Sequence, residues 1–202
     1  FGSFALNGSS GAWSYNLNNT AAQQLSQGQT ATDVFSVTVS DGNGGSATQQ
    51  VTITISGTND APVITTAIDE LTFLEDASAK AQQLKASGVL AFSDVDLLDR
   101  LQVSSSLTTA PIWSGGSISN ALATALGSAL SVSGSNLSNT GSLPWTFSTA
   151  GLDLDFLAAG DTIKLAYTVV VSDNHGASAT DTVNITITGT NDAPLISSGS
   201  AI

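Results

Sequence analysis

Apolar residues alternate with serine and threonine in two neighbouring stretches of the chain, residues 34–39 and 51–55. Alternation with a period of two places Val51, Ile53 and Ile55 on one face of an extended strand and the threonines on the other. The sequence DGNGG lies between the two stretches, and glycine and asparagine tolerate the positive φ angles of tight turns. The pattern therefore predicts a β-hairpin.

The same pattern returns 132 positions further along the chain. Residues 40–64 read SDGNGGSATQQVTITISGTNDAPVI, and residues 172–196 read SDNHGASATDTVNITITGTNDAPLI. The constant offset of 132 (172 minus 40) also aligns Trp13 with Trp145. A repeat of this length is a domain-sized unit, and arrays of β domains usually space, display or adhere.

Shorter apolar or alternating stretches predict further strands, with turn residues between them. These stretches are residues 2–6, 13–17, 71–74, 101–105, 130–133, 145–148, 167–171 and 183–187. Helical periodicity is weak and predicts one short helix within residues 118–126 and a single turn at 21–25. Many short strands with frequent turns indicate an all-β protein built of tandem β-sandwiches.

The segment Asn59-Asp60-Ala61-Pro62 marks the boundary between two units, since the residue before a proline is held in extended geometry. We expect residues 1–60 to be the C-terminal half, or a short variant, of a repeat. Residues 61–196 are expected to form a complete repeat, and 197–202 to begin another linker. Four strands seldom close a sandwich. The first unit is therefore expected to be a compact half-length variant, or to complete its sheet with another segment.

The charge balance is one-sided, with 16 acidic residues against 4 basic ones and a net charge of −12. Such a chain repels phosphate, which argues against nucleic-acid partners and anionic membrane surfaces. The chain has no cysteine, which excludes disulfides and thiol-ligated metals. No apolar run reaches the roughly 18 residues of a membrane span, so no membrane insertion is expected. A divalent cation suits this balance, and so does a solvated acidic surface.

The placement of the acidic residues favours the cation. Asp60 lies in the linker, Glu75 follows the first predicted strand of the second unit, and Asp94, Asp96 and Asp173 lie in predicted loops or at strand ends. Strand ends gather at the poles of a sandwich, where clustered carboxylates repel unless a cation lies among them. Ca²⁺ takes six to eight oxygen ligands, whereas Zn²⁺ would need histidine or cysteine. The alternative is that these side chains cap local turns or lie in solvent.

The sequence resembles two related kinds of repeat. Asp94-Val95-Asp96 resembles the D-x-D of cadherin repeats, and the linker ending in NDAP resembles the cadherin linker. Residues 12–64 and 145–196 are more similar still to VCBS and cadherin-like repeats of giant RTX adhesins in Gram-negative bacteria. The resemblance implies tandem Ig-like, cadherin-like sandwiches in an extracellular extender on the bacterial cell surface, exported by type I secretion, with Ca²⁺ at the junctions.

Carried over by motif, the Ca²⁺ ligands would be Asn59 and Asp60 of the linker together with Glu75, Asp94, Asp96 and Asp173. Two departures from the cadherin pattern imply fewer or weaker ions. The linker has Gly57 and Thr58 in place of an acidic residue, and the L-D-R-E motif has no clean match in residues 1–40. A next junction would use Asp192, with Asp153, Asp155 and Asp161 as candidates from the unit above it.

Other functions find less support in the sequence. The one histidine, His175, is expected to be a solvated turn residue, and no catalytic motif is present, so an enzyme is not expected. Trp13, Trp145 and Phe147 are expected in the core, with sugar stacking as the alternative. The expected partners are neighbouring repeats of the same chain, with host or biofilm surfaces contacted through other domains. The alternative function is a β-sandwich module that binds carbohydrate or protein.

Overall fold

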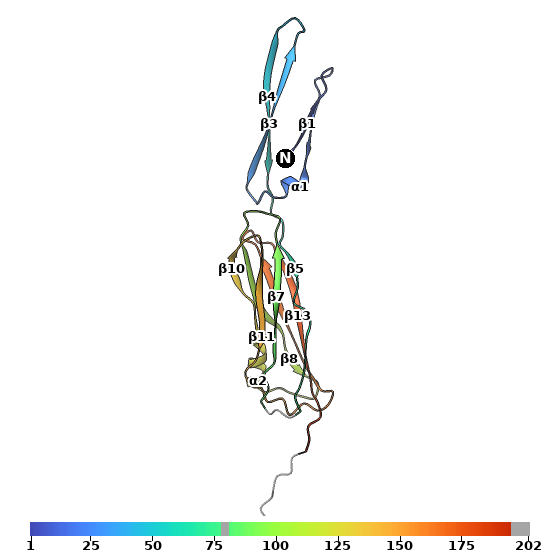
Figure 1. The fold of residues 1–202 in the computed structure, drawn as a ribbon, viewed down its shortest axis with the longest axis vertical. Helices are drawn as coiled ribbons and strands as arrows, with labels where there is room; N and C mark the ends of the chain where they lie inside the picture. The colour runs from blue at the N-terminus through green and yellow to red at the C-terminus, as the bar shows by residue number, and fades with distance from the viewer. Residues whose placement is uncertain (78–80, 195–202) are drawn as a thin grey trace, which may run out of the picture.

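The computed structural model describes residues 1–77 and 81–194, and these form two β units along one long axis (Figure 1). The first unit has two antiparallel hairpins. One pairs β1 (Gly2–Leu6) with β2 (Trp13–Leu17), and the other pairs β3 (Thr30–Ser40) with β4 (Ser46–Ser56). The short helix α1 (Asn19–Ala22) connects the hairpins, and its N-cap Asn18 accepts a hydrogen bond from the amide of Ala21.

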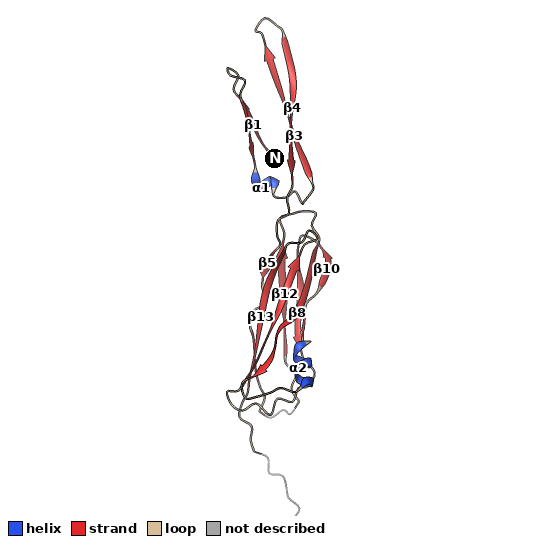
Figure 2. Ribbon diagram, turned by 180° about the vertical axis from the view of Figure 1, so that it is seen from behind, coloured by secondary structure: helices blue, strands red, loops and turns tan. Residues whose placement is uncertain are grey.

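The second unit is a sandwich of two sheets whose strands run along the same axis (Figure 2). The larger sheet has the order β10 (Gly134–Leu137), β8 (Leu101–Trp113), β12 (Thr162–Ser172), β13 (Ser178–Thr188) and β6 (Leu71–Leu74). The smaller sheet has the order β5 (Val63–Thr66), β7 (Lys85–Ser93), β11 (Thr140–Ser148) and β9 (Leu130–Ser131).

The core of the second unit lies between these two sheets. Leu90 and Phe147 from the smaller sheet, and Tyr167 and Ile185 from the larger one, are almost completely buried. Their alternation with exposed residues along each strand is the pattern that the sequence shows. The chain is therefore all-β with an Ig-like sandwich, as predicted.

The second helix, α2 (Asn120–Gly127), lies beside the larger sheet, close to the prediction of a helix within residues 118–126. Its N-cap Ser119 accepts a hydrogen bond from the amide of Leu122, and Leu122 and Leu126 are buried. Neither helix of the described chain has the length and apolar character that crossing a membrane requires.

The prediction of three core aromatic residues is confirmed for two of them. Phe147 is fully buried and Trp145 is 7% exposed, but Trp13 is 56% exposed. Trp145 lies opposite Gly88 of β7, whose missing side chain leaves room for the indole ring. Trp13 is exposed because no strand corresponding to β7 is present in the first unit among the described residues.

Candidate metal centre

Five of the six residues predicted as ligands come from three separate segments. Asp94 and Asp96 lie in the loop that follows β7, and Asp173 begins the turn between β12 and β13. Asn59 and Asp60 belong to the linker. The loop and the linker meet at the pole that faces the first unit, since the amide of Asp60 donates a hydrogen bond to Asp96 Oδ2 at 2.8 Å.

The three segments are tied to one another by side chains. Asn59 donates a hydrogen bond through Nδ2 to Asp173 Oδ2 at 2.9 Å. Asp94, Asp99 and Asp173 each offer a carboxylate oxygen, and these oxygens lie within 4.8 Å of one another. We call Asn59, Asp94, Asp96, Asp99 and Asp173 the junction group. Convergence of loops and strand ends at one pole has therefore brought together residues that are up to 114 positions apart.

Two of these aspartates also shape their own loops. Asp94 Oδ1 accepts a hydrogen bond from the amide of Asp96 at 3.0 Å. Asp173 Oδ1 accepts hydrogen bonds from the amides of residues 175, 176 and 177, at 2.8, 2.6 and 2.9 Å. The turn-capping role that was the alternative for Asp173 is thus present, but it uses one carboxylate oxygen and leaves the other directed to Asn59.

The junction group contains unpaired oxygens in the protein interior. In the described part of the chain, five of its side-chain oxygens are buried without a hydrogen-bond partner: Asn59 Oδ1, Asp94 Oδ2, Asp96 Oδ1 and both carboxylate oxygens of Asp99. Leaving one buried polar atom unpaired costs about 1–3 kcal/mol, and more for a charged group. Five such oxygens in one place form a set of donors with which a hard cation could pair.

The electrostatics of the group point in the same direction. Burial raises the pKa of Asp94, and the charges of Asp96, Asp99 and Asp173 raise it further. Burial also raises the pKa of Asp96, with Asp99 and Asp60 adding repulsion. For Asp173, burial alone would raise the pKa, but the hydrogen bonds from Asn59 and the turn amides outweigh it and lower the pKa. The cluster therefore resists full ionisation unless positive charge lies nearby.

Little positive charge is available from the protein itself. Among residues 1–77 and 81–194, the close pairs of basic and acidic groups are the Phe1 amino group with Asp33, and His175, which is charged only when protonated, with Asp99. His175 is an exposed residue of the turn between β12 and β13, as expected, and its Nε2 atom lies 3.5 Å from Asp99 Oδ1. The donors are carboxylate and amide oxygens, which fit a hard cation such as Ca²⁺. They do not match the nitrogen and sulfur ligands that Zn²⁺ prefers.

The structure does not bring Glu75 into this group, contrary to the expectation. Glu75 follows β6, which pairs in parallel with β13, so Glu75 lies at the opposite pole from Asp173. Its Oε2 accepts a hydrogen bond from the amide of Thr190, and its Oε1 is buried without a partner in the described residues. Burial raises the pKa of Glu75, and the charges of Asp192 and Asp155 add to this.

Asp99 is the member of the junction group that the sequence-based ligand set omits. It is fully buried, and neither of its carboxylate oxygens has a hydrogen-bond partner in the described residues, although Oδ1 lies 3.5 Å from His175 Nε2. The signal in the sequence is that Asp99 is the third aspartate of DVDLLD, in the same short loop as Asp94 and Asp96. Of the aspartates suggested for a next junction, Asp161 has a structural role, because its Oδ2 accepts hydrogen bonds from Trp113 Nε1 and from the amide of Ala158.

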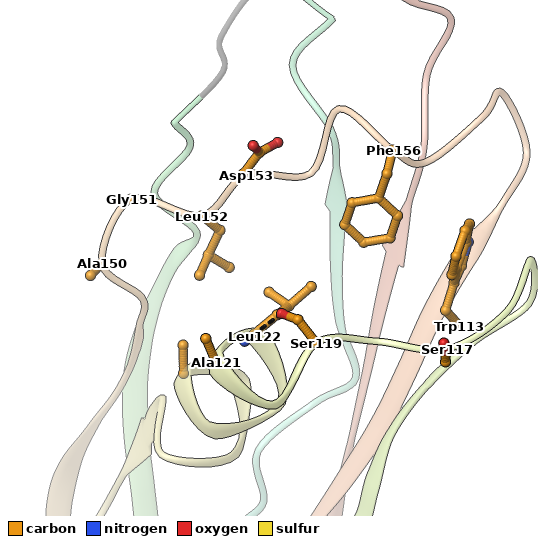
Figure 3. Close-up of a pocket in the computed structure, with 11 residues that line it drawn as sticks. Trp113, Ser117, Ser119, Ala121, Leu122, Ala150, Gly151, Leu152, Asp153 and Phe156 are labelled. Carbon is orange, nitrogen blue, oxygen red and sulfur yellow. Dashed lines mark hydrogen bonds between the residues drawn. The ribbon is translucent and has the colours of Figure 1, made fainter.

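The second unit also has a cavity of about 600 Å³ beside α2 (Figure 3). Trp113, Leu122 and Phe156 contribute apolar walls, and the ring centroids of Trp113 and Phe156 are 4.8 Å apart in an edge-to-face arrangement. Asp153 contributes a carboxylate at the rim, pointing outward in Figure 3. An apolar cavity with an aromatic wall and a few polar groups is the usual form of a small-ligand site.

Comparison with known proteins gives one family match. A sequence model of the family described as bacterial Ig domain matches residues 1–54. No curated protein matches the chain.

Similar solved structures include three that differ widely in origin. AggA, the major subunit of aggregative adherence fimbriae type I from Escherichia coli, is 14% identical, with a TM-score of 0.38 over 64% of this chain and 96% of its own. The PapD-like domain 7 of human CEP192 is 10% identical, with a TM-score of 0.35 over 65% of this chain and 87% of its own. Extracellular domains 1–5 of protocadherin gamma B2 are 16% identical, with a TM-score of 0.41 over 95% of this chain and 32% of theirs.

Proposed function

We propose that this chain is a non-catalytic segment of an extracellular extender on a bacterial surface, and that Ca²⁺ at the junction group makes it rigid. The observation that carries the proposal is the set of five buried, unpaired oxygens contributed by linker, loop and turn. The match of residues 1–54 to the bacterial Ig domain supports the surface location. The VCBS-like repeat pattern supports the role of an extender in an RTX-type adhesin.

An ion at this position would act on the angle between the two units. The linker contributes Asn59, while the second unit contributes the aspartates, so a shared ion would hold the linker against the second unit. The loop of the junction group also contacts the first unit, because the amide of Leu98 donates a hydrogen bond to Ser26 Oγ at 3.1 Å. Ca²⁺ would therefore stabilise the loop that the first unit rests on, and its removal would let the units move.

The size of the expected effect follows from mass action. Extracellular modules bind Ca²⁺ with dissociation constants of about 10⁻⁴–10⁻³ M. One site adds about 2.7 kcal/mol of stability at a hundred times its dissociation constant. The core between the two sheets needs no metal, so the second unit should stay folded in a chelator while its melting temperature falls.

The test is a thermal melt of the full chain in EDTA and across a Ca²⁺ titration, with Mg²⁺ for comparison. We expect a rise that is specific for Ca²⁺ and saturates near millimolar concentration. Replacing Asp94 and Asp96 together with asparagine should abolish it. A chain whose melting temperature is the same in EDTA and in Ca²⁺ would contradict the proposal.

A matched pair of variants separates metal binding from turn formation. Asp173 and Asp41 occupy equivalent turns, and Asp41 Oδ1 likewise accepts hydrogen bonds from two turn amides, those of Asn43 at 2.8 Å and Gly45 at 2.9 Å. Asp41 has no part in the junction group. We expect Asp173→Asn to weaken the Ca²⁺ response and Asp41→Asn to leave it unchanged, although both changes alter a turn. Equal effects would mean that only the turn matters.

One observation favours a second candidate function, ligand binding by the second unit. The cavity beside α2 combines the Trp113 ring with the Asp153 carboxylate, a combination that suits an apolar face and hydroxyl groups of a sugar. The test is a titration of tryptophan fluorescence with a panel of oligosaccharides. Saturable quenching that disappears in Phe156→Ala would support this function, and a flat titration would exclude these ligands.

A further inference from the structure

The long strands of the first unit have counterparts in the second unit. The second unit therefore shows how the inner faces of these strands are packed in a complete sandwich. With the offset of 132, β3 (Thr30–Ser40) corresponds to β12 (Thr162–Ser172), and β4 (Ser46–Ser56) to β13 (Ser178–Thr188). The first unit preserves part of the packing. Tyr15 and Phe35 meet edge to face at 6.1 Å, as their counterparts Phe147 and Tyr167 do at 6.5 Å.

The same positions differ sharply in exposure. Val39 is 67% exposed, whereas its counterpart Val171 is completely buried. Trp13 is 56% exposed and its counterpart Trp145 is 7% exposed. The first unit therefore presents to solvent an apolar surface whose equivalent is the core of the second unit. An exposed surface of this kind marks a place where another segment binds.

The second unit shows which strands cover this surface. On the larger sheet, β8 pairs antiparallel with β12, and β6 pairs in parallel with β13. On the smaller sheet, β7 pairs with β11. All three covering strands come from residues 65–132. In the first unit, by contrast, β3 and β4 form a two-stranded sheet within the described residues, so both of their outer edges have unused hydrogen-bonding groups.

The first hairpin differs from its counterpart in a way that points to the same missing strands. In the second unit, β10 and β11 belong to different sheets, and β10 pairs with β8. In the first unit, β1 pairs instead with β2, from Gly2 opposite Leu17 to Leu6 opposite Trp13. Among the described residues of the first unit no strand corresponds to β8, and β1 pairs with its neighbour β2.

We propose that residues 1–62 are an acceptor half-sandwich, and that they bind a β-segment with the strand pattern of residues 65–132. In the second unit this segment is joined directly ahead of Ser133, the counterpart of Phe1. Binding adds an antiparallel strand to β3 and a parallel strand to β4. It also separates β1 from β2, which then lie in different sheets.

The segment that binds should differ from residues 65–132 in the residue that faces Asp33. Asp33 occupies the position of Leu165, which is 3% exposed in the second unit. Tyr15 donates its hydroxyl hydrogen bond to Asp33 Oδ2 at 2.6 Å. A covering segment buries this carboxylate, so it presents a hydrogen-bond donor to Asp33 where residues 65–132 face a leucine.

The experiment compares the full chain with the same chain carrying a copy of residues 65–132 ahead of Phe1. Amide hydrogen exchange is measured in β3 and in its counterpart β12. In the full chain alone we expect rapid exchange in β3, and in the prefixed chain we expect slowing by at least about a hundredfold toward the rates in β12. The control prefix carries Leu101→Asp and Val103→Asp, two buried positions of β8, and should give no slowing. In the chain that carries the unaltered copy of residues 65–132, Asp33→Leu should slow exchange in β3 further.

Cysteine pairs test the register, because the chain has no cysteine of its own. Thr168 lies opposite Ser106 in the second unit, and Ser36 is the counterpart of Thr168. Ser36→Cys should therefore form a disulfide with Ser106→Cys in the prefix, and not with Ser104→Cys, which lies two residues away along the strand. Ser3→Cys and Asn16→Cys, opposite each other in β1 and β2, should form a disulfide in the full chain and not in the prefixed one.

Three results would overturn the proposal. Exchange in β3 that is already as slow as in β12 would show that the half-unit is complete by itself. Unchanged exchange in the prefixed chain would show that this segment does not bind. A dimer of the full chain in which β3 is protected would show that a second copy covers the open face.

Discussion

The side-chain amide of Asn59 donates a hydrogen bond to Asp173 across 114 positions of sequence, and so attaches the linker to a hairpin turn of the second unit. The other amide atom of Asn59, Oδ1, is one of the buried unpaired oxygens of the junction group. A single side chain thus both holds the linker in place and supplies an oxygen to the proposed ion.

Replacing Asn59 with alanine should loosen the junction in two ways. The hydrogen bond to a charged acceptor is worth about 1.5–3 kcal/mol, so the melting temperature in EDTA should fall. The Ca²⁺ titration midpoint should also move to higher concentration, because an oxygen ligand is lost. The control is Asn191→Ala at the equivalent position, where the side chain donates a hydrogen bond to the carbonyl of its neighbour Asp192. Equal loss in both variants would disagree with the role given to Asn59.

Gly88 should be intolerant of any side chain. A Cβ atom at this position would lie 2.8 Å from the indole ring of Trp145, which the surrounding core holds in place. We expect Gly88→Ala to destabilise the second unit by about 1–3 kcal/mol, the usual cost of overpacking. Gly151→Ala is the control, since its Cβ would meet Ala81 at an ordinary 3.4 Å. Chemical denaturation measures both, and a neutral Gly88→Ala would contradict the packing described.

The hydroxyl of Tyr167 should contribute to stability through one internal acceptor. It donates a hydrogen bond to the carbonyl oxygen of Leu126 at the end of α2, in a buried environment. Tyr167→Phe removes this hydrogen bond, while the carbonyl of Leu126 keeps the one from the amide of Ala129 at 3.4 Å, so we expect a cost of about 0.5–1.5 kcal/mol in the free energy of unfolding. Phe35→Tyr, the reverse change at the equivalent position of the open first unit, should have little effect in the same denaturation experiment.

The pair of Tyr15 and Asp33 should give the first unit a dependence on alkaline pH. Burial, with the hydrogen bond and charge of Asp33, raises the pKa of Tyr15 from 10.0 to about 12. A group with a raised pKa contributes stability that is complete below the unfolded-state value and is lost as pH rises through the folded-state value. That contribution should therefore disappear between pH 10 and about 12.

Absorbance of the phenolate measures this titration directly. In Asp33→Asn the pKa of Tyr15 should move back toward 10.0, because the charge and its hydrogen bond are lost. Tyr15→Phe identifies which tyrosine is being observed, since Tyr167 remains. If the high-pH step persisted unchanged in Asp33→Asn, the contact between the two side chains would not be its cause.

Periodicity and turn chemistry were sufficient to predict the long hairpins, because they depend on residues that are close in sequence. The pole at which Glu75 lies was not predictable in this way. Its position depends on the parallel pairing of β6 with β13. The direction in which two distant strands pair does not change the alternation of apolar and polar residues within either strand. The buried position of Asp99 likewise depends on the path of its loop, which the linker and the turn at Asp173 enclose.

The exposure of Trp13 also depends on long-range strand pairing, here the pairing that completes a whole domain. Its local sequence predicts a core strand, and Trp13 aligns with the buried Trp145 in the repeat. Whether it is buried is decided by strands that would pair with its neighbours, and these are not encoded in the residues around it.

The parallel pairing of β6 with β13 has a mechanical consequence for a chain under tension. The polypeptide enters the second unit near Asp60 and leaves near Asp192, at opposite poles, and β6 and β13 are the strands of the larger sheet nearest the two ends. Pulling on both ends loads β5 against β7 and β6 against β13 in shear, so the hydrogen bonds within each pair bear the load together rather than one after another. A unit connected in this way resists stretching best along its own long axis, the direction in which flow would pull a tethered filament.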